Sequence, residues 1–198
     1  MSTRILSLAR GASLLAVLAL ALPALAAPIK FSSIPEGWTP VKIKAFAKKF
    51  RNAQYKVPAA EGDKRGGMVI VYNPMGGSVE ANIKRWKGQV TQEKGDPEPK
   101  VETKTIGGLK VTIVDLQGTY TPTAMRPNAK VKPQRGARVI NAIIESGEGN
   151  YFVKFIAPKA TAKAQEKNFH SFLGSLTASG KAKAGDKAPE KKPTSRPS

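Results

Sequence analysis

The fold is decided by one stretch of sequence, VETKTI-GG-LKVTIVDLQGTY, which spans residues 101–120. Its two runs are rich in β-branched residues, and the glycine pair Gly107-Gly108 between them is typical of a hairpin turn. A second hairpin is expected from Val139–Ile144 and Tyr151–Ile156. Because hairpins that follow one another along the chain tend to lie side by side, these segments predict a mainly antiparallel sheet.

Two helices are expected, one on either side of these hairpins. The first has apolar residues that recur at helical spacing and share one face: Val79, Ile83, Trp86 and Val90. Ser78 precedes this face as a natural N-cap. The second helix is expected from Thr161 to Leu176. With shorter extended segments at Phe31–Trp38, Phe50–Val57 and Met68–Tyr72, the chain is expected to form an α+β fold, a mainly antiparallel sheet covered by amphipathic helices.

The composition excludes several classes of chemistry. The 198 residues include no cysteine and one histidine, His170, which excludes thiol nucleophiles, disulfides, iron–sulfur clusters and multi-histidine metal sites. The chain carries 33 Lys and Arg against 14 Asp and Glu, a formal net charge of +19. We therefore expect no cofactor and no metal, and a partner that is negatively charged.

Both ends of the chain are expected to lie outside the fold. Residues 1–26 are typical of a secretory signal, because Arg4 and Arg10 precede an apolar run and Ala24 and Ala26 allow cleavage after residue 26. Residues 179–198 contain no large apolar residue and are rich in Lys, Pro and Ala, which is typical of a disordered tail. We expect a single globular domain over residues 27–178, exported to the periplasm or the extracellular space, with no membrane span after cleavage.

Four motifs together resemble a group of exported, uncharacterised bacterial proteins. They are Phe31-x-x-Ile34-Pro35-x-Gly37-Trp38, Arg51-x-Ala53-Gln54-Tyr55, Gly76-Gly77-Ser78-Val79-Glu80-Ala81-Asn82-Ile83-x-Arg85-Trp86, and Tyr151-Phe152-Val153-Lys154-Phe155-x-x-Pro158 before a Phe-rich helix. The layout of these proteins is similar to the α/β/α sandwich of PsbP, the extrinsic protein of the oxygen-evolving complex, and its relatives. The resemblance spans residues 30–177. It implies this fold and, because relatives of PsbP mostly bind partners, a binding protein; it implies no metal or photosystem chemistry.

The sequence contains no strong pattern of catalytic residues. His170 stands beside the apolar stripe of the last helix, and no Gly-x-Ser-x-Gly motif accompanies it. Asp115 interrupts the apolar pattern of its strand, and its simplest reading is the partner of a nearby Lys or Arg. We therefore expect a protein that is not an enzyme. The alternative is a small envelope hydrolase that uses Asp115 and His170, or Glu145, if these groups converge in one pocket.

The first candidate binding site is the joint that precedes the first helix. Glycines and the free N–H groups of a helix start favour an anion. The residues concerned are Gly76, Gly77, Ser78, Asn82 and Arg85. No Lys-Ser/Thr pair follows in the register of a P-loop, and a simple turn with an N-cap is the alternative reading. Arg85 alternatively holds a backbone carbonyl or a carboxylate such as Asp115.

The second candidate binding site is the long connection Thr121–Arg138. It contains five basic residues and no acid: Arg126, Lys130, Lys132, Arg135 and Arg138. A connection of this length suggests either a function or disorder. It is therefore either an anion-binding loop or a solvated mobile one.

Taken together, these features predict a non-catalytic binding or accessory protein of the envelope that docks through a basic surface. The expected partner is an anionic protein, a polysaccharide or lipid headgroups. Nucleic acid is disfavoured, because lysines outnumber arginines and the strands lack the aromatic pattern of RNA-binding sheets. A structural accessory without any ligand site is a further alternative.

Overall fold

The computed structural model describes residues 28–123 and 131–178 of the chain. The expected signal segment 1–26 and the expected tail 179–198 lie outside the described residues. Two of the candidate cations, Arg126 and Lys130, also lie outside them.

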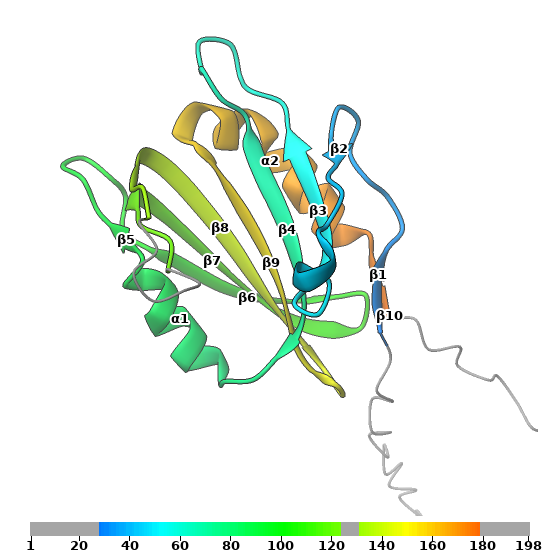
Figure 1. The fold of residues 1–198 in the computed structure, drawn as a ribbon. Coiled ribbons are helices and arrows are strands. Elements are labelled where there is room, and N and C mark those ends of the chain that lie inside the picture. Colours follow the sequence, from blue (N-terminus) through cyan, green and yellow to red (C-terminus); the bar gives the residue numbers. More distant parts are fainter. Residues whose placement is uncertain (1–27, 124–130, 179–198) are drawn as a thin grey trace, which may run out of the picture.

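The centre of the molecule is an eight-stranded antiparallel sheet (Figure 1). Its strands run in the order β2-β3-β4-β9-β8-β7-β5, and β6 pairs with β7 off this path. Their bounds are β2 Thr39–Pro40, β3 Arg51–Val57, β4 Gly67–Met75, β5 Val90–Thr91, β6 Lys100–Ile106, β7 Leu109–Tyr120, β8 Gln134–Ser146 and β9 Gly149–Pro158. A separate antiparallel pair joins β1, Ile29–Phe31, to β10, Leu176–Ala178. The mainly antiparallel α+β class predicted from the sequence is therefore confirmed.

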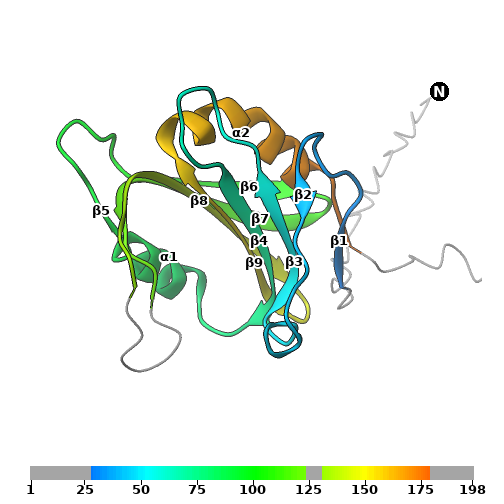
Figure 2. The same ribbon diagram turned by 45° about the horizontal axis from the view of Figure 1, so that its top comes forward.

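Two α-helices and one short 3-10 helix complete the fold: α1 Val79–Lys87, α2 Lys159–Gly174 and η1 Ala45–Ala47. The two α-helices pack against opposite faces of the sheet (Figure 2). Successive residues of a strand point to opposite faces, and β9 shows the result. Phe152 packs with Trp86 of α1, whereas Val153 and Phe155 pack in the cluster that holds Phe169 of α2. Within residues 28–123 and 131–178, no helix is long and apolar enough to cross a membrane.

Both hairpins predicted from the sequence are present, and the second is longer than predicted. The Gly107-Gly108 turn joins β6 to β7 with Ile106 opposite Leu109. The second hairpin, β8–β9, extends to Gln134 at one end and to Pro158 at the other. The predicted end of the connection Thr121–Arg138 is therefore wrong, because β8 begins at Gln134 and pairs with β7 and β9.

Both helices end earlier than predicted. Helix α1 stops at Lys87, and Val90 of its predicted apolar face belongs to β5, which pairs with the end of β7. Helix α2 stops at Gly174, and Leu176 belongs to β10. In both cases a strand pairing with a distant partner takes over a residue that fits the helical pattern, and such pairings cannot be read from local periodicity.

Candidate functional site

Three of the residues predicted around the start of α1, Ser78, Asn82 and Arg85, are linked by hydrogen bonds. Ser78 caps the helix as predicted, because its Oγ accepts from the Ala81 N–H at 3.1 Å. Asn82 is buried, and its Nδ2 donates to the Ser78 carbonyl at 2.8 Å while its Oδ1 accepts from Arg85 at 2.6 Å. Gly77 has φ +99°, and a Cβ there would lie 3.0 Å from Asn82 Nδ2. Asn82 therefore positions its neighbours, while Gly76, Gly77, Ser78 and Arg85 stay exposed.

The candidate cations of the long connection are not brought together as one loop. Arg135 and Arg138 lie in β8, so only Lys132 belongs to the described part of the connection. Lys132 and Arg135 are both exposed. For Arg138, the expectation of a free loop cation is wrong.

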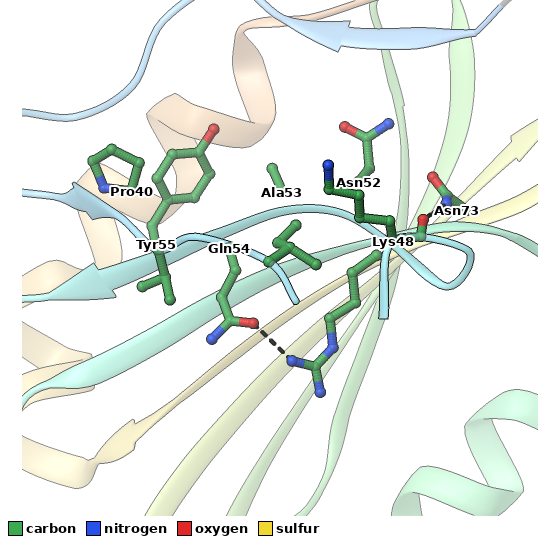
Figure 3. A pocket seen from close by; sticks show the side chains of 10 residues that line it. Pro40, Lys48, Asn52, Ala53, Gln54, Tyr55 and Asn73 are labelled. Atoms are coloured by element: carbon green, nitrogen blue, oxygen red, sulfur yellow. Dashed lines mark hydrogen bonds between the residues drawn. The ribbon is translucent and has the colours of Figure 1, made fainter. Parts of the chain in front are cut away.

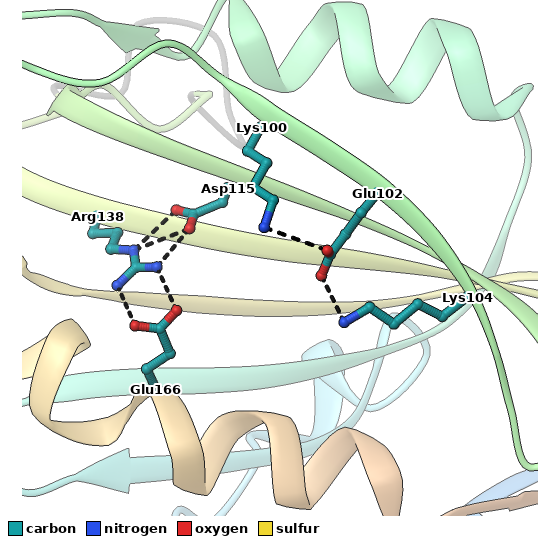
Figure 4. Close-up of polar contacts among 6 residues, drawn as sticks. All are labelled: Lys100, Glu102, Lys104, Asp115, Arg138 and Glu166. Carbon is teal, nitrogen blue, oxygen red and sulfur yellow. Dashed lines mark hydrogen bonds and ion pairs between the residues drawn. The ribbon is translucent and has the colours of Figure 1, made fainter.

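Arg138, which is itself buried, is instead the centre of a partly buried ion cluster (Figure 4). It is 9 % exposed, and its guanidinium donates to both oxygens of Asp115, at 2.6 to 3.2 Å, and to both oxygens of Glu166, at 2.9 and 3.0 Å. The hydrogen bonds that Arg138 donates to Asp115, and to a smaller extent those it donates to Glu166, raise the pKa of Arg138. The bonds to Glu166 also hold the pKa of that carboxyl below its usual range. The prediction that Asp115 is the partner of a basic residue is confirmed, and this cluster joins β7, β8 and α2.

The groups named for a hydrolase meet only in part. Asp115 and His170 line one small hollow of about 30 Å³, which is room for about one water molecule. Among the described residues no hydrogen bond joins them, and both Asp115 oxygens already accept from Arg138. Glu145 does not line this hollow and pairs with Lys110 at 3.0 Å. The geometry gives the hydrolase alternative little support, and it stays a prediction; within the described ranges, no three His, Cys, Asp or Glu residues are grouped to hold a metal.

A basic segment that no sequence motif marks lies on the surface and runs into the first residue of β3. We call residues 41–51 (VKIKAFAKKFR) the basic segment; it contains Lys42, Lys44, Lys48, Lys49 and Arg51 and no acid. Two phenylalanines are exposed within it, Phe46 by 61 % and Phe50 by 40 %. The available signal was the absence of any acid between Glu36 and Glu61. Lysines alternating with apolar residues resemble an edge strand, so exposed aromatic side chains could not be foreseen there.

The basic segment is fixed to the sheet by its backbone. Asn73 of β4 donates through Nδ2 to the carbonyls of Lys48 and Lys49, at 2.9 and 3.2 Å, and its N–H donates to the Phe50 carbonyl at 2.9 Å. Ala47 is buried, as expected for the one apolar anchor of η1. Phe46 and Phe50 therefore face solvent from a backbone segment that hydrogen bonds fix to the sheet.

A shallow pocket of about 540 Å³ lies beside the basic segment (Figure 3). It is bordered by Lys48 and Arg51 of the segment and by polar residues of the neighbouring strands, including Asn52 and Tyr55. The Arg51 guanidinium donates to Gln54 Oε1 at 2.8 Å. Its charge is thus oriented by a neutral amide and has no carboxylate partner among the described residues.

A second pocket, of about 420 Å³, lies between α1 and the sheet. Arg85, a predicted site residue, lines it together with Arg51 and a lysine that the sequence reading did not single out, Lys154 of β9. Lys154 looks from the sequence like an outward-facing residue in an alternating strand. It is buried because α1 covers that face of the sheet, which only the tertiary fold reveals.

Comparisons with known proteins add a distant structural neighbour. No protein-family model matches the sequence, and no curated protein matches it. Among the solved structures that match is that of PA94, a Pseudomonas aeruginosa protein of unknown function. It is 12 % identical, the match covers 69 % of this chain and 94 % of that chain, and the TM-score is 0.44.

Proposed function

We propose that the protein is an exported, non-catalytic binding protein that docks on an anionic partner of the cell envelope through its basic segment. Of the partners expected from the sequence, anionic lipid headgroups fit this segment best. The observation that carries the proposal is the combination of five uncompensated cations with exposed Phe46 and Phe50 on a held backbone. Signal-like residues 1–26 support export.

The charge of the segment suits the surface of an anionic membrane. Each Lys or Arg near such a surface contributes about 1 kcal/mol of attraction, which falls off within a Debye length. None of Lys42, Lys44, Lys48 and Lys49 forms an ion pair within the described residues. Their attraction is therefore available to a partner.

The exposed phenylalanines favour a lipid over a polysaccharide. Interfacial segments place Lys and Arg at the headgroups and aromatic side chains at the boundary with the acyl chains. Lys49 Nζ lies 4.8 Å from the centre of the Phe50 ring, so charge and aromatic surface are adjacent here. Phe46 is the most exposed large apolar residue in the described ranges, and the acyl-chain boundary of a bilayer would remove its apolar surface from water.

For the fold, we propose the PsbP-like sandwich that the sequence motifs imply. One helix on each face of an antiparallel sheet supports this proposal. The function proposed above does not depend on it.

The docking proposal is tested by sedimentation with vesicles. One set contains phosphatidylglycerol mixed with phosphatidylcholine, and the other contains phosphatidylcholine alone. We expect binding to the first set only, weakened by salt. The double variant Lys44→Glu/Lys48→Glu should weaken binding by about thirtyfold or more, since roughly 2 to 4 kcal/mol of attraction is lost or reversed.

The matched control is Lys163→Glu/Lys167→Glu, which makes the same change of charge on exposed positions of α2. It should retain most of the binding. Equal losses in both variants would show that net charge alone acts and would overturn the assignment to the basic segment. Absence of vesicle binding, with retention on an anionic envelope protein or polysaccharide, would overturn the lipid as partner.

A further inference from the structure

The lining of the pocket between α1 and the sheet has an apolar part and a polar part. Its apolar part comes from the sheet and from α1: Ile70, Met75, Trp86, Phe152 and Ile156. Its polar part is cationic, with Arg51, Arg85 and Lys154, and is completed by Tyr72 and Tyr120. Its volume of about 420 Å³ falls within the range of small-molecule sites.

Lys154 is a buried charge without a counter-ion. Lys154 is 8 % exposed, and its Nζ donates to Gln89 Oε1 at 3.2 Å and to the Tyr120 hydroxyl at 3.5 Å. No carboxylate pairs with it among the described residues, and residues 124–130 contain no acid. Burying a charge without a counter-ion is costly, so the fold holds this amine at an energetic disadvantage that an anion would remove.

All three cations of this pocket are held by neutral amides. Lys154 bonds to Gln89, Arg85 bonds to Asn82, and Arg51 bonds to Gln54. The Arg138 cluster on the other face is the contrast, because there the same fold neutralises a buried cation with two carboxylates. An amide orients a cation and leaves its charge free for a ligand.

Asn141 is a second, independent observation on the same face. It lies directly opposite Lys154 in the β8–β9 register, so both side chains project from one face of the sheet. Asn141 is 0 % exposed, and neither its Nδ2 nor its Oδ1 has a hydrogen-bond partner within the described residues. Buried amides without a partner are uncommon. Asn141 is not among the residues that line the pocket, so it adds to the polar character of the face beside Lys154 and does not itself contact a ligand.

We propose that this pocket binds a small organic carboxylate with an apolar body, its carboxylate held by Lys154 and Arg85 and its body packed against Trp86 and Phe152. Burial lowers the pKa of Lys154 to about 8, and the nearby charge of Arg85 contributes to this shift. Two neighbouring cations suit a carboxylate, which can accept from both. The apolar half of the lining selects against small inorganic anions, which leave it uncovered.

This site is separate from the docking surface in its key residues. The basic segment borders the pocket through Ala47, Phe50 and Arg51, whereas Lys154 and Arg85 lie outside the segment. The ligand proposal therefore survives if vesicle binding fails, and the converse also holds.

The test is calorimetric titration with a series of probes, from phenylpropionate and phenylbutyrate to octanoate, each compared with its neutral primary amide. We expect at least one carboxylate to saturate the protein and its amide to bind about tenfold more weakly, as for the loss of one charge-assisted hydrogen bond. Lys154→Met should remove most of this preference, since Arg85 is then the remaining cation that the carboxylate contacts. The control Lys104→Met, on exposed β6, should leave it unchanged.

A second readout is the uptake of protons when the unmodified protein binds the carboxylate. A bound anion favours the charged amine and raises its pKa, so binding near pH 8.5 should take up protons, seen as a dependence of the heat on the ionisation enthalpy of the buffer. Lys154→Gln should remove this uptake. The proposal is overturned if no carboxylate of the series saturates, or if the carboxylate preference and the proton uptake are undiminished in a cooperatively folded Lys154 variant.

Discussion

At the scale of single residues, two buried cations define the molecule. Arg138 and Lys154 project from opposite faces of the sheet and are almost equally buried, at 9 % and 8 % exposure. Arg138 has two carboxylate partners, whereas Lys154 has none among the described residues. Lys154 bonds to an amide and a hydroxyl and lies over the rings of Trp86 and Tyr120. The first arrangement stabilises the fold, and the second keeps a charge available at a cost in stability.

The cost of Lys154 should be visible in the pH dependence of stability. Its pKa falls from about 10.4 in an unfolded chain to about 8 in the fold, so between these values the unfolded state binds more protons. Stability from this group therefore rises with pH across that window. Lys154→Met should unfold with a free energy up to about 3 kcal/mol above wild type at pH 7, and the gap should narrow to below about 1 kcal/mol by pH 10 and to near zero by about pH 11. Urea unfolding at a series of pH values measures it; a gap that is constant with pH would contradict the depressed pKa.

The opposite result is expected for Arg138. Arg138→Met leaves Asp115, whose side chain is 20 % exposed, without its counter-ion. Loss of one partner of a fully buried pair costs about 3–5 kcal/mol in the free energy of unfolding, and the partial exposure of Asp115 and Glu166 lowers the expected cost to about 2–3 kcal/mol. The exposed pair of Lys104 with Glu102 is the comparison, and Lys104→Met should cost less than about 1 kcal/mol. Similar costs for both variants in urea unfolding would show that the Arg138 cluster is not structural.

At the scale of elements, the glycine pair Gly107-Gly108 illustrates how a turn is specified. Both residues have positive φ, +57° and +78°. A Cβ on Gly107 would lie 2.2 Å from the Leu176 carbonyl oxygen, whereas a Cβ on Gly108 would have no neighbour within 4 Å. Gly107 is therefore needed for its backbone angle and also for the close approach of β10.

Alanine substitutions separate these two requirements. Gly108→Ala should cost only the strain of the left-handed backbone, about 1–2 kcal/mol. Gly107→Ala should cost clearly more, because it also pushes against the start of β10. Thermal unfolding of the two variants makes the comparison, and equal shifts in Tm would mean that β10 does not press on the turn.

The elements that sequence predicts are those set by local pattern. The β6–β7 hairpin, the Ser78 cap of α1 and the apolar stripe of α2 follow from spacing and turn chemistry alone. Pairings between distant segments, such as β1 with β10, have no local signal. The pocket around Lys154 could not be predicted for the same reason, since it joins α1 to residues of β4, β7 and β9.

The predicted site residues show the same division. Gly77, Ser78, Asn82 and Arg85 are close in sequence, and the structure brings them together at α1. Sequence alone groups Arg138 with the loop cations, because nothing in its own segment shows that Glu166, far along the chain, reaches it. Charge patterns along a chain therefore identify cations but not their partners.

At the scale of the whole molecule, the net charge of +19 and the position of the basic segment act together. Long-range attraction to an anionic surface is general, while the exposed Phe46 and Phe50 give the docking its orientation. High salt should therefore weaken the encounter, since exposed charges are screened over about 8 Å at physiological ionic strength.

The most direct measurement places a fluorescent side chain where the membrane contact is expected. Phe46→Trp adds an indole at an exposed position, while the native Trp38 and Trp86 are buried and serve as a constant background. On addition of vesicles containing phosphatidylglycerol and brominated acyl chains, the added emission should shift to the blue and be quenched, and high salt should reverse both changes. Emission that stays at the solvent-exposed wavelength and unquenched, while the protein sediments with these vesicles, would contradict docking through the basic segment.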